Sequence, residues 1–520
     1  MESVQVGVGP VSVDDVLAVA RSRAGVVLTE EALIAIDRAR AVVDELAAAP
    51  TPAYGISTGF GALATRHIPA DLRDQLQRSL IRSHAAGSGP EVEREVVRGL
   101  MLLRLSTLAT GHTGVRRETA QLMASLLSAG ITPVVREYGS LGCSGDLAPL
   151  AHCALVLMGE GDVRDANDTL MPAADALAAA GLHPVQLGAK EGLALINGTD
   201  GMLAMLVMAI TDLRRLLRTA DIAAAMSVEA QMGTDRVFAA DLQALRPQVG
   251  QSLSAANLTR VLAGSGVMAH HREDRFHRVQ DAYSLRCSPQ VHGAARDTVD
   301  HAATVAEREL ASAIDNPVVL VDEGRVESNG NFHGAPIAYV LDFLAIVTAD
   351  VASISERRSD RFLDRARNHD LPPFLADDPG VDSGLMIAQY TQAAIVSELK
   401  RLAMPASVDS IPSSAMQEDH VSMGWNAARK LRRSVDGLTR VVAIELMTAA
   451  RGLELRTTTG DTAGTTPAPA TGAVVRLLRE HGVGAPGPDR FLSPEIETAV
   501  ELVASGAVLS AVQEVIGELA

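Results

Sequence analysis

The tripeptide Cys143-Ser144-Gly145 is the segment of this 520-residue chain with the most unusual chemical potential. Gly145 has no side chain, so its amide nitrogen can approach the Cys143 carbonyl closely enough to attack it. The attack closes a five-membered ring and releases water, and loss of the Ser144 hydroxyl as a second water leaves an exocyclic alkene. The product is a methylidene-imidazolone, an electrophile of a kind that cofactors usually supply. Taken alone, a Ser-Gly pair in a glycine-rich segment more often forms an ordinary turn.

A second group of polar side chains is predicted to share one helical face. Gln280, Tyr283 and Arg286 fall at positions i, i+3 and i+6, which places them roughly along one side of a helix. An arginine can hold a carboxylate through two parallel hydrogen bonds, so this face could bind an acidic group. A solvent-exposed surface is the alternative interpretation.

Other segments carry isolated polar residues in apolar or glycine-rich surroundings. Tyr54 lies in a loop, His84 follows a serine, and Asn197 begins an Asn-Gly turn signal. Such residues more often anchor a surface or a turn than act in catalysis. Glu418 and Asp419 precede a histidine, which is typical of an acid/base or metal cluster but also of exposed charge. No HExxH or Cys/His ligand spacing occurs, so we predict no metal site.

Helices are expected to position these segments. Two helices are expected within residues 12–48, the first capped by Ser12 and Asp14 or Asp15 and the second opened by Thr29. The proline- and glycine-rich stretch 49–61 is predicted to be a loop. Apolar residues at spacings of three and four predict long packed helices over 203–217 and 337–354. Further helices are predicted over 385–403, 425–451 and 493–519.

This pattern predicts a mainly α protein with two domains. Residues 1–200 would form a smaller N-terminal domain that carries the tripeptide, and residues 201–520 would form a long helical bundle. The helix that follows Gly201 is apolar on every side, because Met202, Met205 and Met208 flank its leucine stripe. We attribute part of its burial to neighbouring subunits.

Composition limits the classes of function. The net charge of −17 argues against general nucleic-acid binding, which relies on basic patches. Three cysteines without a CxxC pair argue against a disulfide framework and for a reducing compartment. The N-terminus lacks a signal-peptide pattern, and the longest apolar run, Met202 to Ile210, is too short to span a bilayer. We therefore predict a cytoplasmic protein without a membrane partner.

Eight segments of the chain resemble, in order, those of the aromatic amino acid ammonia-lyases. A single motif would say little, but eight in register over about 370 residues are highly specific. The resemblance implies a fumarase/aspartase-like helical architecture and a homotetramer whose active sites are shared between subunits. The segments are Tyr54-Gly-Ile-Ser-Thr-Gly-Phe-Gly, Ser83-His-Ala-Ala-Gly, Gly139-Ser-Leu-Gly-Cys-Ser-Gly-Asp-Leu-Ala-Pro-Leu, Asn197-Gly-Thr, Gln280-Asp-Ala-Tyr-Ser-Leu-Arg, Asp315-Asn-Pro, Gly330-Asn-Phe-His and Gln417-Glu-Asp-His-Val-Ser-Met.

The resemblance also implies roles for the matching residues. Ser144 would provide the electrophilic carbon of the methylidene-imidazolone, and Asp146 would help the ring to form. The enzyme would then need no dissociable cofactor. Tyr283 would remove a proton from the substrate β-carbon, and Tyr54 would assist above the electrophile. The substrate-binding residues would be Arg286 at the carboxylate, Asn197 and Gln280 as polar partners, Phe332 near the electrophile, and His84, Met386 and Glu418 around the side chain.

One residue departs from the family pattern. The first residue of the tripeptide is commonly alanine, and here it is Cys143. Only its carbonyl takes part in ring closure, so we expect the ring to form. Its thiol, however, would lie close enough to the electrophile to compete for it or to oxidise.

Within the family the segments are most similar to those of the members that act on histidine. This implies non-oxidative deamination of L-histidine, a small amino acid substrate, to trans-urocanate and ammonia, the first step of histidine degradation. Glu418 can accept a hydrogen bond from an imidazole N–H, whereas beside a phenyl ring it would be buried without a partner, which is costly.

Three alternatives remain. The nearest is a lyase or 2,3-aminomutase that uses the same electrophile on tyrosine or phenylalanine, because His84 can also hydrogen-bond a phenol. The second is a fumarase/aspartase-like lyase without an internal electrophile, although its GSSxMPxKxN loop is absent from the sequence. The third is a non-enzymatic helical scaffold.

Overall fold

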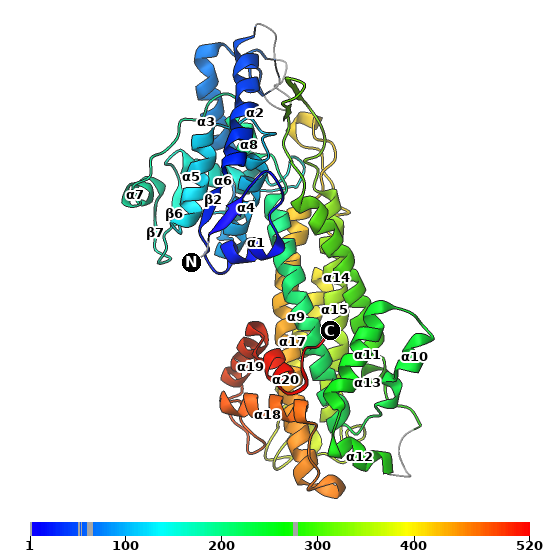
Figure 1. Cartoon of the computed structure of the whole chain (residues 1–520). Coiled ribbons are helices and arrows are strands. Elements are labelled where there is room, and N and C mark those ends of the chain that lie inside the picture. Colours follow the sequence, from blue (N-terminus) through cyan, green and yellow to red (C-terminus); the bar gives the residue numbers. More distant parts are fainter. Residues whose placement is uncertain (1–2, 50–52, 54, 60–65, 274–278) are drawn as a thin grey trace. The chain divides into compact units, whose positions relative to one another are not determined.

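The computed structural model describes residues 3–49, 53, 55–59, 66–273 and 279–520. Helices make up most of these residues, which confirms the mainly α prediction (Figure 1). The chain divides into two compact units, one made of Met1–Met208, Ala303–Asp342 and Pro405–Arg429, the other of Ala209–Ala302, Phe343–Met404 and Lys430–Ala520. The chain passes from one unit to the other between Met404 and Pro405 and also within four of the described long helices: α9 (Asp200–Ala230), α14 (Ser288–Leu310), α15 (Ala335–Leu363) and α17 (Gly424–Thr458).

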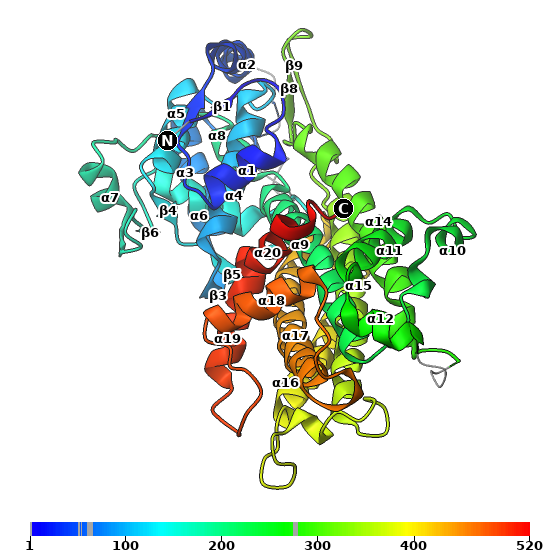
Figure 2. The same cartoon turned by 60° about the horizontal axis from the view of Figure 1, so that its bottom comes forward.

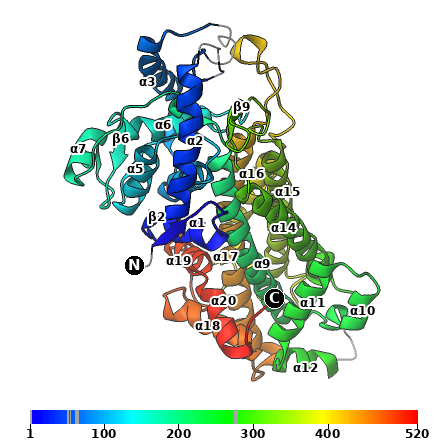
Figure 3. The same cartoon turned by 45° about the horizontal axis from the view of Figure 1, so that its top comes forward.

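The first unit combines helices with short strands (Figure 3). Its other helices are α1 (Val13–Ala20), α2 (Glu30–Ala48), α3 (Arg73–His84), α4 (Arg94–Ala109), α5 (Arg117–Ser128), α6 (Leu147–Leu157), α7 (Ala173–Ala179) and α8 (Glu191–Ile196), with 3-10 turns η2 (Ala70–Leu72) and η5 (Ser414–Met416). Among the described residues of this unit, the strands form four small sheets. They are parallel β1 (Val4–Val6) and β2 (Val26–Leu28), antiparallel β3 (Ser88–Glu91) and β5 (Arg136–Tyr138), antiparallel β4 (Thr132–Pro133), β6 (Asp162–Arg164) and β7 (Leu170–Pro172), and antiparallel β8 (Val318–Leu320) and β9 (Arg325–Glu327).

The first two helices begin where their caps predict. The Ser12 hydroxyl accepts a hydrogen bond from the Asp15 amide (3.1 Å), and the Asp15 carboxylate accepts one from the Ser12 amide (2.9 Å), a complete capping box. Thr29 accepts from the Ala32 amide at the start of α2 (3.2 Å). Strand β2 separates the two helices, and Val4 lies opposite Val26 in its pairing with β1.

The second unit is almost entirely helical (Figure 2). Its remaining helices are α10 (Ala240–Ala244), α11 (Val249–Leu262), α12 (Gly266–Glu273), α13 (Tyr283–Arg286), α16 (Met386–Leu402), α18 (Pro469–Glu480), α19 (Ser493–Ser505) and α20 (Ala507–Ile516), with 3-10 turns η3 (Arg236–Phe238), η4 (Pro373–Leu375) and η6 (Gly460–Thr462).

Buried polar side chains join the long helices of this unit, in addition to their apolar packing. The Glu445 carboxylate on α17 accepts hydrogen bonds from Ser227 on α9 (2.7 Å), Ser355 on α15 (2.6 Å) and Arg358 on α15. All four side chains are buried, so each must find a partner within the protein. This shared carboxylate fixes how α9, α15 and α17 align.

Two sequence predictions need correction here. Met202, Met205 and Met208 are fully buried by their own chain, so the apolar surface of this helix needs no neighbouring subunit to cover it. The predicted helix over 493–519 is two helices, α19 and α20, because Gly506 takes a left-handed conformation (φ +86°) between them.

Helix α15 is long and apolar enough, by length and composition, to cross a bilayer, and the bent pair α19 and α20 would pass the same test together. Most of the apolar stretch of α15 is buried inside the protein. Asp342 within it is also buried, and its carboxylate accepts a hydrogen bond from the Ser407 amide (2.7 Å). These properties are those of a core helix.

Candidate active site

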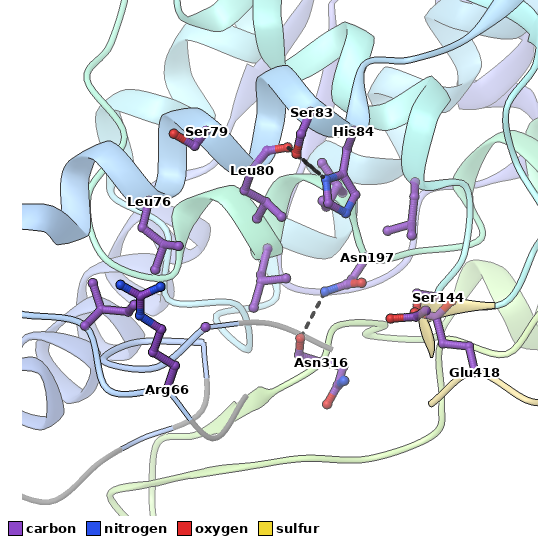
Figure 4. Close-up of a pocket in the computed structure, with 16 residues that line it drawn as sticks. Arg66, Leu76, Ser79, Leu80, Ser83, His84, Ser144, Asn197, Asn316 and Glu418 are labelled. Carbon is purple, nitrogen blue, oxygen red and sulfur yellow. Dashed lines mark hydrogen bonds between the residues drawn. The ribbon is translucent and has the colours of Figure 1, made fainter. Parts of the chain in front are cut away.

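A cavity of about 460 Å³ in the first unit brings four of the predicted site residues together. His84 comes from the end of α3, Ser144 from the glycine-rich loop before α6, Asn197 from the end of α8, and Glu418 from the segment after η5. Figure 4 shows Ser144 and Glu418 side by side at one end of this cavity and Arg66 at the other. Leucine and isoleucine side chains form much of the remaining lining, together with further polar residues.

The conformation of the loop explains why residue 145 is a glycine. Gly145 has φ of +80°, a left-handed conformation that side chains disfavour, and it pairs with Gly198 as in a parallel sheet. The Asp146 amide donates to the Gly198 carbonyl (2.7 Å), and a Cβ atom on Gly145 would lie 2.1 Å from that oxygen. Among the described residues, the Cys143 carbonyl and the Gly145 amide form no hydrogen bond. The two groups that ring closure would join are therefore not held in other interactions.

Asp146 is a fully buried carboxylate directly after the tripeptide. One carboxylate oxygen accepts from the Ser140 hydroxyl (2.9 Å), and the other accepts from the Gly201 and Met202 amides (2.9 Å each) at the start of α9. Burial, with the Asp200 charge nearby, outweighs these bonds and raises the pKa of Asp146 from 3.8 to about 7. Asp146 thus connects the loop to α9.

We expect Asp146→Asn to weaken the pH dependence of stability. The folded state keeps its proton up to about pH 7, while the unfolded chain loses it near pH 3.8, so this group's contribution to stability falls as pH rises from 4 to 7. The loss amounts to about 4 kcal/mol at most. Asparagine keeps a similar shape without this titration. The wild type should therefore lose thermal stability relative to the variant between pH 5 and pH 8, so that the midpoint of the variant minus that of the wild type increases. A difference that stays constant over this range would contradict the raised pKa of Asp146.

Buried charged side chains hold the segment around Asn197 in the wall of the cavity. Arg104 donates to the Asn197 carbonyl and, at 2.7 Å, to that of Ile314, while the Asn197 side-chain amide donates to the Asn316 carbonyl (2.9 Å). Next to Asn316, the Asp315 carboxylate forms a fully buried ion pair with Lys190. Removing either partner of a buried ion pair leaves an uncompensated buried charge, which strongly destabilises the fold. The pair therefore holds this wall of the cavity in place.

The contacts of His84 determine which of its ring nitrogens carries a proton. Nδ1 lies 2.9 Å from the Leu80 carbonyl, which can only accept a hydrogen bond, and 3.1 Å from the Ser83 hydroxyl, which can accept as well as donate. Nδ1 is therefore the protonated nitrogen of the neutral ring, and Nε2 is an acceptor. Burial lowers the pKa of His84, which favours this neutral form.

Glu418 is held by two side chains. Its Oε2 accepts from the Ser413 hydroxyl (2.8 Å) and from the Cys143 thiol (3.2 Å). The cavity therefore offers a ligand two acceptors, His84 Nε2 and the Glu418 carboxylate, near Ser144.

The other predicted residues lie elsewhere. Gln280, Tyr283, Arg286 and Met386 belong to the second unit, Phe332 is half-buried in the first unit outside the lining of this cavity, and Tyr54 lies outside the described residues. The Arg286 guanidinium stacks 4.8 Å above the centre of the Tyr283 ring and donates to Gln280 Oε1 (3.1 Å).

The prediction that Gln280, Tyr283 and Arg286 share a helical face was wrong in its geometry. Helix α13 begins at Tyr283, and Gln280 precedes it. The Asp281 carboxylate accepts from the Thr234 amide (2.6 Å), which holds this segment out of a helix. The three side chains nevertheless cluster, because Arg286 reaches back to Gln280.

Sequence reasoning assigned no role to several residues at this site. Asn316, Ser79, Ser83 and Arg66 also line the cavity, and Ser140 and Ser413 hold the two carboxylates. Asn316 and Ser83 do lie in segments quoted for the resemblance, Asp315-Asn-Pro and Ser83-His-Ala-Ala-Gly. Their neighbours carried the recognisable chemistry, so these two had no signal of their own.

Comparison with known proteins relates this site to a family. The model of the aromatic amino acid lyase family matches residues 11–480. Histidine ammonia-lyase of Streptomyces griseus is 65% identical over 520 residues, with both chains fully covered. The crystal structure of histidine ammonia-lyase from Trypanosoma cruzi is 37% identical, with a TM-score of 0.89 over 99% of this chain and 96% of the other. That of tyrosine aminomutase from Streptomyces globisporus is 35% identical, with a TM-score of 0.92 over the whole of both chains. These similarities confirm the predicted fumarase/aspartase-like helical class.

Proposed function

The chain belongs to the aromatic amino acid lyase family, and on that basis we propose that it removes ammonia from L-histidine without oxidation to give trans-urocanate. The observation that carries the choice of substrate is the pair of acceptors in the cavity, Glu418 and His84 Nε2, near Ser144. The full-length similarity to histidine ammonia-lyase of Streptomyces griseus supports the same substrate.

The residues of the glycine-rich loop fit a methylidene-imidazolone made from Cys143, Ser144 and Gly145. Gly145 occupies a position where no side chain fits, and its amide and the Cys143 carbonyl form no hydrogen bond among the described residues. When formed, this group supplies an electrophilic carbon that binds the substrate amine and makes it a better leaving group.

Side chains of the cavity recognise the imidazole of the substrate. An imidazole N–H can donate to the Glu418 carboxylate, and a donor on the substrate can also reach His84 Nε2. A phenyl ring has no donor, and beside it the carboxylate would lose water without gaining a partner. A phenol has one donor, which His84 can accept, so tyrosine is the second candidate substrate; the similarity to tyrosine aminomutase supports it.

The remaining residues act on the other parts of the substrate and on the electrophile. Tyr283 takes the proton from the β-carbon, and the Arg286 guanidinium lies 4.8 Å above the centre of its ring. Arg286 binds the carboxylate, with Gln280 and Asn197 as polar partners. Phe332 and Met386 contribute apolar contacts, Tyr54 assists near the electrophile, and Asp146 helps the ring to form.

We also place this chemistry in a cytoplasmic homotetramer whose active sites combine residues of several subunits. The resemblance to the family supports this assembly, and the mass of the purified enzyme in solution tests it.

The direct test of the reaction uses purified enzyme with L-histidine, L-tyrosine and L-phenylalanine in parallel. We expect urocanate and an equal amount of ammonia from histidine, and little turnover of the other two. A β-amino acid or a cinnamate-type product, without urocanate, would make the second candidate the function.

Glu418→Gln is expected to reduce kcat/KM for histidine by about 10- to 100-fold, the contribution of one hydrogen bond to a charged group. Glutamine keeps the size of the side chain but loses its charge. Asp419→Asn removes the adjacent exposed carboxylate, which does not line the cavity, and should leave kcat/KM unchanged. Equal effects of the two variants would mean that Glu418 acts only through the overall charge of the site.

A further inference from the structure

The thiol of Cys143 contacts a carboxylate that lines the cavity. Its Sγ lies 3.2 Å from Glu418 Oε2, and the Ser413 hydroxyl lies 2.8 Å from the same oxygen. In the part of the chain that the structure describes, Glu418 Oε1 receives no hydrogen bond. Two donors thus hold one oxygen of the carboxylate and leave the other for a ligand.

The thiol keeps its proton here and can donate it to the carboxylate. Burial, followed by the negative charge of Glu418, raises the pKa of Cys143 from 9.0 to about 12. The proton therefore stays on sulfur at neutral pH, and a protonated thiol is a poor nucleophile. We therefore expect the Cys143 thiol not to react with the electrophile beside it.

The backbone around Glu418 is already fixed by other contacts. The Ser413 amide donates to the Glu418 carbonyl (2.8 Å), and the Glu418 amide donates to the Ser413 carbonyl (3.2 Å), which closes a tight turn. Cys143 packs against Val421 and Met423, just beyond it. What these contacts leave free is rotation of the carboxylate itself, which the two side-chain donors then restrict.

We propose that Cys143 and Ser413 are positioning residues that orient the Glu418 carboxylate toward the imidazole of the substrate. This inference rests on the proposed function, because it concerns how tightly histidine is held. An alanine in place of Cys143 would leave the same ring-forming carbonyl but no donor, so the cysteine adds binding rather than ring chemistry.

The test compares Cys143→Ala, Cys143→Ser and Ser413→Ala with the wild type, using kcat and KM for L-histidine and the intact mass of each protein. Cys143→Ala should raise KM by about three- to tenfold, the typical contribution of one such hydrogen bond, with kcat nearly unchanged and the mass still short by two waters. Cys143→Ser restores a donor and should return KM toward the wild-type value. Ser413→Ala should raise KM in the same way.

A matched control separates positioning from packing. Cys153 on α6 is also buried, and it has no contact with Glu418, so Cys153→Ala should leave KM unchanged. If Cys143→Ala lowers kcat and loses the two-water mass difference at unchanged KM, the thiol serves ring formation and the inference is wrong. Unchanged kcat and KM in Cys143→Ala would also overturn it. If the wild type forms no urocanate, it is the proposed function that fails.

Discussion

Ser144→Ala is expected to abolish turnover while leaving the protein folded. Alanine has no hydroxyl to lose, so the exocyclic alkene cannot form, and no ordinary side chain replaces such an electrophile. We expect kcat for histidine to fall by at least about 10³-fold. The intact mass should show the loss of at most one water, whereas the wild type should be short by two, localised to the peptide that spans residues 143–145.

The fold should tolerate this change because Ser144 contributes little to it. The residue is half-buried, and among the described residues its hydroxyl forms no hydrogen bond. Ser79→Ala is the matched control, since Ser79 also lines the cavity but lies on α3. It should retain activity and the loss of two waters. Turnover by Ser144→Ala, or a full-length unmodified mass for the active wild type, would remove the electrophile from the mechanism.

Local signals in the sequence predicted the elements well. Ser12 and Thr29 cap α1 and α2 as expected, because a cap depends only on residues three positions away. The apolar stripe of α15 and the helices α16 and α17 also lie close to their predicted ranges, because a spacing of three and four is read within one segment. Where a single glycine interrupts such a pattern, as Gly506 does, periodicity alone does not reveal the break.

Contacts between distant segments could not be predicted. Cys143 and Glu418 are 275 positions apart, and nothing in either segment indicates that a thiol and a carboxylate meet. The pairing of Gly145 with Gly198 likewise joins two glycine turns that look ordinary on their own. The resemblance to a family identified Ser144, His84, Asn197 and Glu418 as one site, but the hydrogen bonds that orient them depend on the folded chain.

Gly145→Ala is expected to prevent ring formation and thus to abolish activity. Its Cβ would lie 2.1, 2.4 and 2.6 Å from the carbonyl oxygen, carbonyl carbon and nitrogen of Gly198. These are backbone atoms, so relief requires the two segments to separate, which breaks the hydrogen bond from the Asp146 amide to the Gly198 carbonyl. Crowding and the left-handed φ together should cost about 2 to 5 kcal/mol. The mass should show no loss of water.

Gly181→Ala distinguishes the clash from the backbone strain alone. Gly181 also has a left-handed φ (+68°), but a Cβ there meets no atom within 4 Å. This variant should lower the free energy of unfolding by about 1 kcal/mol and keep both the two-water mass loss and the activity. Gly145→Ala should lose both while thermal unfolding still shows a cooperative transition. If Gly145→Ala instead behaves like Gly181→Ala, the approach of Gly145 to Gly198 is not what prepares the tripeptide for ring closure.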